Sequence, residues 1–194
     1  MENISLLGCG TWGSALAQVL AENGHKVTAW HYKDEAVAYM SNSRKHPNLN
    51  GFQFHESIAF DSNLENLVNN TKCLVIAVPS HSVREIMAEI SNYQSTNAII
   101  VNVSKGIEND SLKTMSEVIC EVTGSDLSKI VTLYGPSHAE EVINKNPTSV
   151  VISSKSKKLE KSLQQLLSDE NFRVYCNEDI VGVQLGGAVK NVIS

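Results

Sequence analysis

The sequence predicts an α/β fold in which a doubly wound, largely parallel sheet carries helices on both faces. Apolar runs of strand length alternate along the chain with longer segments whose apolar residues repeat at helical spacing. This alternation is typical of βαβ units, which build parallel sheets. The run at residues 73–78 is continuous in apolar residues, as expected for a strand buried on both faces, and Pro79 ends it.

The first elements form one βαβ unit. Residues 4–7 predict a strand that runs into a glycine-rich turn, and residues 14–23 predict the helix that follows. Gly24 is a natural end for that helix, because glycine readily adopts the left-handed conformation that closes many helices. Residues 26–30 predict the second strand, which lies parallel to the first.

The rest of the chain repeats this alternation. Residues 41–61 are the least regular stretch, and we expect a loop with short strand pieces there. Further strands are predicted at residues 73–78, 98–103, 130–134, 148–153 and 172–175, and further helices at residues 83–90, 112–122 and 159–167.

Composition and charge exclude several classes of protein. The chain has 16 basic and 21 acidic residues, and its net charge of -5 has the wrong sign for coating nucleic acid or binding an anionic membrane. The N-terminus lacks the basic region of a signal peptide, and no apolar run reaches the ~20 residues of a membrane span, so we expect a cytoplasmic protein. The cysteines and histidines lack metal-ligand spacing, so no metal site is predicted.

A glycine-rich loop joins the first predicted strand to the first predicted helix and fits the pattern G-x-G-x-x-G. Gly8 allows a tight turn, Gly10 lets the backbone approach a pyrophosphate, and Gly13 lets the helix pack closely on the strand. The anion would lie on free N–H groups at the positive end of the helix dipole. The sequence therefore predicts a Rossmann-like domain that binds NAD or NADP, although three glycines that merely form a turn remain the alternative.

The residues after the second predicted strand favour NADP. NAD-specific domains usually place a carboxylate there for the ribose hydroxyls. Here the first carboxylate is Asp34, which we expect to lie past the strand edge, whereas Lys33 and His31 offer positive charge to a 2′-phosphate. The alternative is that Lys33 is an exposed loop lysine.

Polar residues follow three predicted strands at the edge where ligands bind in open parallel sheets. Lys105 with Gly106 provides a cation beside open backbone, which suits a phosphate or a carbonyl oxygen. Ser137 at a helix start could offer both a hydroxyl and an N–H group to the same ligand. A surface lysine is the alternative for Lys105. The three segments, which could line one crevice, are residues 78–81, 104–108 and 135–139.

The last segment is a strongly apolar helix from residue 179 that reaches Ser194 without a capping signal. We expect it to be buried, against either a second copy of the chain in a homo-oligomer or a further domain. Lys190 interrupts its apolar residues, and a buried lysine is costly unless it is paired or deprotonated. Desolvation and a nearby cation would lower its pKa, as a general acid or base requires. The alternative is that Lys190 extends to the surface.

These motifs together resemble those of the bacterial NAD(P)-dependent glycerol-3-phosphate dehydrogenase family, from residue 4 to residue 194. The resemblance implies that Lys190 is the proton donor or acceptor. It implies that Lys105, Gly135 and Ser137 contact the substrate. The cofactor site that it implies contains Thr11, Trp12, Tyr32, Lys33, Lys105 and Ala139. The motifs that carry the resemblance are residues 8–13, 78–81, 104–108, 135–137 and, most specifically, 182–193.

The implied reaction is reversible hydride transfer between NAD(P)H and C2 of a small phosphorylated substrate, dihydroxyacetone phosphate, which supplies sn-glycerol 3-phosphate for phospholipid synthesis. Family members continue into an all-helical domain. We therefore divide the chain into a dinucleotide-binding domain at residues 1–178 and the start of a truncated helical substrate domain at residues 179–194. The alternatives are a related 3-hydroxyacid or ketopantoate reductase, and a dinucleotide-sensing module without catalysis.

Overall fold

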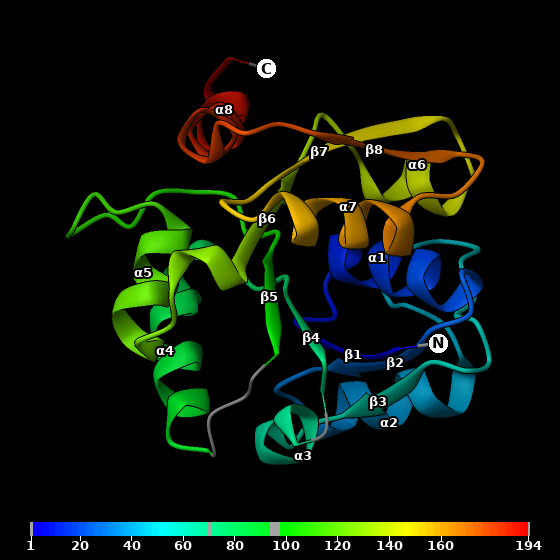
Figure 1. Cartoon of the computed structure of the whole chain (residues 1–194). Helices are drawn as coiled ribbons and strands as arrows, with labels where there is room; N and C mark the ends of the chain where they lie inside the picture. Colours follow the sequence, from blue (N-terminus) through cyan, green and yellow to red (C-terminus); the bar gives the residue numbers. More distant parts are fainter. Residues whose placement is uncertain (1, 70, 94–97, 194) are drawn as a thin grey trace.

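The computed structural model describes residues 2–69, 71–93 and 98–193. Within this part of the chain one eight-stranded sheet has the order β3-β2-β1-β4-β5-β6-β7-β8 (Figure 1). Neighbouring strands are parallel except β6 and β7, which are antiparallel. This confirms the doubly wound, largely parallel fold. The strands are β1 (Asn3–Leu7), β2 (Lys26–Trp30), β3 (Ala59–Asp61), β4 (Cys73–Ile76), β5 (Ile99–Asn102), β6 (Ile130–Tyr134), β7 (Thr148–Ser153) and β8 (Phe172–Cys176).

The helices cover both faces of the sheet, and each face has its own apolar cluster. One face carries α1 (Thr11–Glu22), α2 (Asp34–Ser43), α6 (Ala139–Ile143) and α7 (Lys157–Leu167). The other carries α3 (Leu64–Val68), α4 (Ser80–Ser91), α5 (Met115–Thr123) and α8 (Ile180–Ile193), with the short 3-10 turn Leu127–Lys129 before β6. α8 belongs to this second face because its Gln184 bonds to Ser116 of α5.

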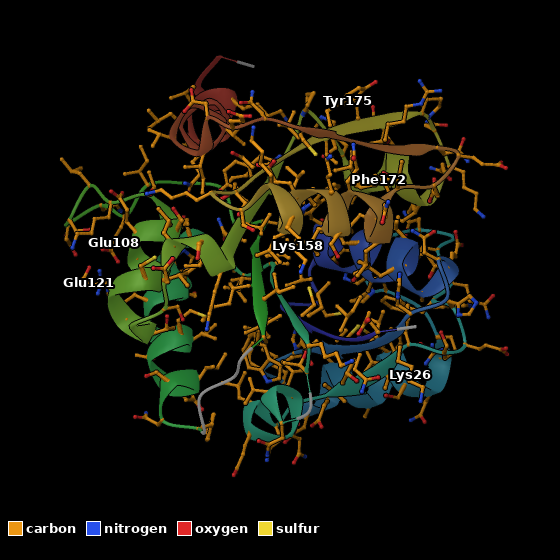
Figure 2. The ribbon with its side chains drawn as sticks, viewed as in Figure 1. Lys26, Glu108, Glu121, Lys158, Phe172 and Tyr175 are labelled. Carbon is orange, nitrogen blue, oxygen red and sulfur yellow. The ribbon has the colours of Figure 1, made fainter. Side chains whose placement is uncertain are left out.

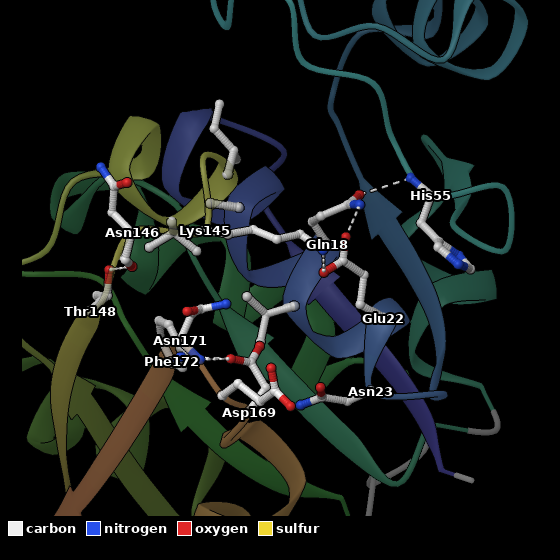
Figure 3. Close-up of a pocket in the computed structure, with 15 residues that line it drawn as sticks. Gln18, Glu22, Asn23, His55, Lys145, Asn146, Thr148, Asp169, Asn171 and Phe172 are labelled. Carbon is white, nitrogen blue, oxygen red and sulfur yellow. Dashed lines mark hydrogen bonds and ion pairs between the residues drawn. The ribbon is translucent and has the colours of Figure 1, made fainter.

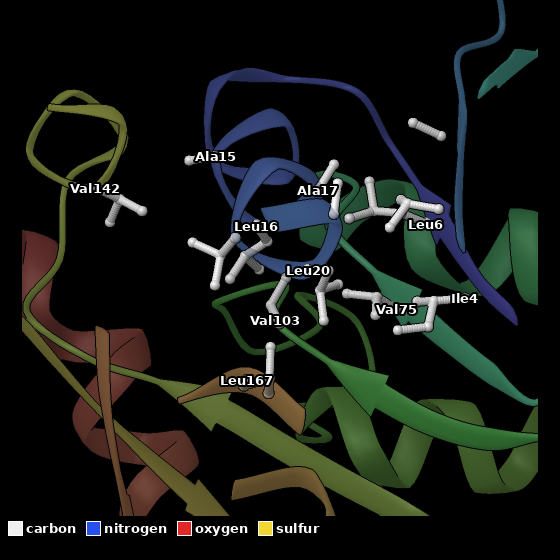
Figure 4. Packing of buried hydrophobic residues seen from close by; sticks show 14 of the residues in the cluster. Ile4, Leu6, Ala15, Leu16, Ala17, Leu20, Val75, Val103, Val142 and Leu167 are labelled. Atoms are coloured by element: carbon white, nitrogen blue, oxygen red, sulfur yellow. The ribbon is translucent and has the colours of Figure 1, made fainter. Parts of the chain in front are cut away.

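The position of α1 is fixed by its packing against the centre of the sheet. Leu16 and Leu20 are fully buried and lie beside Leu6 and Val75 of the neighbouring strands β1 and β4 (Figure 4). Burial of such a side chain contributes roughly 1.5–3 kcal/mol. Because α1 cannot shift without losing these contacts, the loop that precedes it is held at the end of β1.

Two helices were not predicted from the sequence. α2 buries only Met40, so its apolar periodicity is faint, and α3 is five residues long. The segment 44–58 is irregular, as expected. It begins with Arg44 in the left-handed conformation (φ 56°), whose Nη1 donates to the carbonyl of Ile58 at 2.9 Å.

Within this chain the last helix, α8, is buried along one side, and its cover by a second copy or a further domain stays a prediction. Ile180 and Gln184 are buried, but Val181, Leu185 and Val189 are 54%, 42% and 44% exposed. α8 contacts the chain along one face only, because the sheet and α5 cover just that side. Among the described residues, no helix has the length and apolarity needed to cross a bilayer.

Candidate functional site

The carboxyl ends of β1, β4, β5 and β6 open into a cleft of about 1050 Å³. The cleft lies where the chain changes direction across the sheet, between β1 and β4, which is the usual ligand position in doubly wound folds. Lys33, Gly135 and Lys190 are not among the residues that line it. The predicted site residues that do line it are Gly8, Gly10, Thr11, Trp12, Gly13, Tyr32, Lys105, Ser137 and Ala139.

Sterics within the chain require two of the three loop glycines, Gly8 and Gly13, whereas Gly10 is open. Gly8 has a φ of 100°, and a Cβ there would lie 2.6 Å from the carbonyl oxygen of Ala77. A Cβ on Gly13 would lie 2.0 Å from the carbonyl oxygen of Gly8, so only glycine lets α1 approach β1. A Cβ on Gly10 would meet no heavy atom within 4 Å, because Gly10 faces the open cleft. The loop has the geometry that a pyrophosphate needs.

His46 forms a hydrogen bond with the backbone of this loop, and the sequence analysis did not identify it as a site residue. Its Nδ1 accepts from the backbone N–H of Asn48 at 3.1 Å, which leaves the hydrogen on Nε2. Nε2 therefore donates to the carbonyl of Cys9, 3.2 Å away, between the first two glycines. Burial lowers the pKa of His46 and keeps the ring neutral. The irregular segment carries no periodicity that could have revealed this contact.

We predict that His46→Ala weakens NAD(P)H binding about fivefold, because a hydrogen bond of this kind is worth about 1 kcal/mol. Fluorescence titration of the chain with NADH and NADPH measures the effect. His46→Gln keeps a side-chain N–H donor and should restore most of the affinity. His55→Ala, which removes a half-buried ring bonded to Ser57 outside the loop, is the control. Unchanged affinity in His46→Ala would show that the loop keeps its conformation without the His46 hydrogen bond.

Two rings and a lysine follow β2. His31 and Tyr32 are stacked with centroids 4.8 Å apart, and Lys33 Nζ lies 5.3 Å from the Tyr32 ring centroid. Tyr32 is 68% exposed, so its ring is free to contact a ligand. Lys33 stands at the N-cap of α2, beside the residues that line the cleft.

Lys105 is half-buried and fixed in position. Its Nζ donates to the carbonyl of Gly135 at 2.8 Å and lies 5.9 Å from the Trp12 ring centroid. Burial, and after it the positive charge of Lys190, lower the pKa of Lys105. The structure therefore brings Lys105, Gly135 and Trp12 together, and the charge of Lys190 acts on the Lys105 amine.

The segment after Lys105 is anchored by ion pairs at the edge of α4 and α5. Arg84 donates to both carboxylate oxygens of Glu108, at 2.7 and 2.8 Å, and to Glu121 at 3.2 Å. Figure 2 shows the two glutamates at this edge of the molecule. The Arg84 bonds lower the pKa of Glu108 to about 2. This anchors the loop that carries Lys105 at its far end.

Two buried polar atoms of cleft residues have no partner within the described residues. These are Ser137 Oγ and Trp12 Nε1. Buried polar groups are nearly always hydrogen-bonded, so such orphans point to a ligand. Together with the open backbone at Gly10, they fit a phosphate-bearing dinucleotide and a polar substrate side by side.

A second cavity, of about 430 Å³, lies at the opposite end of α1 (Figure 3). Its polar groups bond to one another. Gln18 Nε2 donates to Glu22 at 2.8 Å, Gln18 Oε1 accepts from the His55 N–H at 2.8 Å, and Lys145 pairs with Glu22 at 3.3 Å. With its polar groups already paired, this cavity is a weaker candidate than the cleft.

The N-terminal and central part of the chain, residues 3–160, matches the family profile described as NAD-dependent glycerol-3-phosphate dehydrogenase N-terminus. The chain is 42% identical over 98% of its length to glycerol-3-phosphate dehydrogenase (NAD(P)+) of Thermoanaerobacter sp. (strain X514), and 40% identical over 100% to that of Bacillus licheniformis. It spans 57% of each of these relatives.

Solved structures of glycerol-3-phosphate dehydrogenases share the fold of this chain. The chain superposes on glycerol-3-phosphate dehydrogenase from Coxiella burnetii with a TM-score of 0.89 and 33% identity, over 99% of this chain and 58% of that one. The Plasmodium falciparum enzyme gives a TM-score of 0.91 at 23% identity, over 99% of this chain and 57% of that one, which supports the fold alone. The matched profile, the relatives and the cleft geometry agree, and this chain belongs to the NAD-dependent glycerol-3-phosphate dehydrogenase family, whose N-terminal part it matches.

Proposed function

We propose that the chain is the cofactor-binding part of an oxidoreductase that reduces dihydroxyacetone phosphate to sn-glycerol 3-phosphate with NAD(P)H. The observation that carries this is the juxtaposition, in one cleft, of an open glycine-rich loop, the fixed Lys105 amine and the unpaired Ser137 hydroxyl. In this proposal residues 1–178 bind the dinucleotide and residues 179–194 begin the helical substrate part. The protein acts in the cytoplasm on a small phosphorylated molecule, without nucleic acid or membrane.

The side chains divide the work as follows. The bound nicotinamide would supply a hydride to C2 of the ketone. Lys105 binds the substrate and stabilises the negative charge that develops on the C2 oxygen, and Lys190 donates the proton to that oxygen. Ser137 donates to the phosphate, and the Gly135 carbonyl holds the Lys105 amine in place. Thr11, Trp12, Tyr32 and Ala139 contact the dinucleotide.

The test is oxidation of NAD(P)H by the full-length gene product with dihydroxyacetone phosphate. Dihydroxyacetone without phosphate should react poorly. Faster turnover with ketopantoate or a 3-oxoacid would favour the related reductases, and dinucleotide binding without turnover of any of these would favour a sensing module. The 194-residue chain alone should bind cofactor and turn over slowly, because water can enter the cleft.

NADP preference is a further proposal that rests on Lys33. We predict that the chain binds NADPH more tightly than NADH, and that Lys33→Glu reverses the preference by exchanging attraction for repulsion at the 2′-phosphate. Lys45→Glu makes the same charge change in the irregular segment that follows α2 and should leave the ratio unchanged. Fluorescence titration with both cofactors decides it. Equal affinities in the unsubstituted chain would contradict the preference.

A further inference from the structure

Tyr134, the last residue of β6, joins the elements that carry the two lysines. It is 2% exposed and does not line the cleft. Its hydroxyl donates to the carbonyl of Ser104 and accepts from Asn102 Nδ2 at 3.0 Å. Burial raises the pKa of Tyr134, so the phenol keeps the proton that it donates. The residue directly before Lys105 is thus bonded to the end of β6.

The N–H and the hydroxyl of Ser104 are hydrogen-bonded as well. Its N–H donates to Asn102 Oδ1 at 3.2 Å, and its hydroxyl donates to the carbonyl of Val78 at 2.6 Å. Such a fully connected buried network is rigid, because moving any member leaves a polar group unpaired. The backbone from which Lys105 projects therefore has one position, and the Tyr134 hydroxyl is one of the groups that defines it.

Tyr134 also contacts α8 through its ring. A Cβ on Gly187 would lie 2.3 Å from Tyr134 Cδ2, so the helix backbone rests against the ring as closely as glycine allows. Gly186, its neighbour, would meet nothing within 4 Å. Lys190 follows Gly187 by three residues, so the two lie on neighbouring positions of one helix face. The ring thus sets the distance of that face from β6.

We propose that Tyr134 is a positioning residue that fixes the separation of the Lys105 and Lys190 amines, its hydroxyl holding the Ser104 peptide and its ring seating Gly187 of α8. This rests on the proposed function in so far as both amines act on one substrate. The charge of Lys190 acts on Lys105, which is the physical consequence of that separation. Because the face of α8 with Val181 and Leu185 is exposed, the helix is free to shift when the ring contact changes.

The experiment follows the titration of the Lys105 amine in the 194-residue chain by NMR with isotope-labelled lysine Cε, with the signal assigned from Lys105→Arg. Lys190→Met should raise the midpoint of Lys105, because a like charge is removed. In the Tyr134→Phe background, the same substitution should raise it by no more than about half as much. Gly187→Ala, which pushes α8 from the ring, should reduce the coupling similarly.

Two control variants distinguish the loss of the Tyr134 contacts from a general loss of stability. Gly186→Ala adds the same methyl group where there is room, and Tyr93→Phe removes a phenol hydroxyl that bonds Glu89 at 3.1 Å. Neither should change the coupling. The remaining titratable groups of the cleft stay constant in all variants; they are Cys9, His31, Tyr32, His81, Glu85, Glu89, His138 and Glu140.

Unchanged coupling in both Tyr134→Phe and Gly187→Ala would overturn the proposal, as would the absence of any effect of Lys190→Met in the unsubstituted chain. If Tyr134→Phe does not fold, the proposal is tested by comparing the Lys105–Lys190 coupling in Gly187→Ala with that in Gly186→Ala. The coupling is measured without substrate, so it survives a failure of the proposed function. Conversely, turnover with dihydroxyacetone phosphate and no role for Tyr134 in the coupling would refute this inference alone.

Discussion

Lys190→Ala in the full-length gene product is expected to lower kcat for dihydroxyacetone phosphate reduction by about 10² to 10⁴, the usual contribution of a general acid. The substitution removes the proposed proton donor to the C2 oxygen. The dissociation constant for NAD(P)H should stay nearly constant, because in the proposed function the dinucleotide contacts the glycine-rich loop and not Lys190. Steady-state kinetics and cofactor titration give the two quantities.

Lys158→Ala is the matched control, since Lys158 is an exposed lysine on α7, the helix at the other face of the sheet (Figure 2). It should leave kcat unchanged. If Lys190→Ala keeps the kcat of the unsubstituted enzyme, or if its loss follows weaker cofactor binding, Lys190 is structural and the assignment of the proton donor is wrong.

Alanine at two positions of the glycine-rich loop should affect different properties, folding stability at Gly13 and cofactor affinity at Gly10. Gly13→Ala forces a Cβ to within 2.0 Å of the Gly8 carbonyl oxygen, so α1 must move away from β1. We expect a loss of about 3 kcal/mol of folding stability, or a fall of roughly 6–12 °C in Tm. Thermal unfolding followed by circular dichroism measures it.

Gly10→Ala should instead leave Tm unchanged and weaken NAD(P)H binding at least about tenfold, or about 1.4 kcal/mol. The new Cβ meets nothing in the chain, and a φ of -75° suits alanine, but the methyl group occupies the side of the loop that a pyrophosphate approaches. Full affinity in Gly10→Ala would place the dinucleotide elsewhere, and an unchanged Tm in Gly13→Ala would contradict the close packing.

Much of the site could be predicted because it consists of short motifs at strand ends. In a parallel sheet the carboxyl ends of strands meet at one edge, so the loops at Gly8, Lys105 and Ser137 had to converge once the strands were identified. The interruption of an apolar helix by Lys190 was likewise visible. What the pattern did not reveal is that burial and the charge of Lys190 lower the pKa of Lys105.

His46 and Tyr134 could not be predicted as parts of the site. His46 lies in a segment without periodicity, and the carbonyl that it reaches is 37 residues away in the sequence. Tyr134 looked like an ordinary strand residue, and its partners Asn102 and Gly187 come from other elements. The antiparallel direction of β7 and the existence of the weakly amphipathic α2 could not be predicted for a similar reason. The direction of a strand and the burial of a helix depend on the elements packed beside them.

The sequence by itself determined the strands and the longer amphipathic helices, the glycine-rich loop and the residues that follow each strand, because hydrophobic periodicity and glycine stereochemistry are local properties. Only the tertiary structure decided which of those residues touch: Lys105 with the Gly135 carbonyl, His46 with the Cys9 carbonyl, and the Tyr134 ring with Gly187. Such contacts join distant segments, and their geometry follows from how the sheet twists and how closely each helix packs on it.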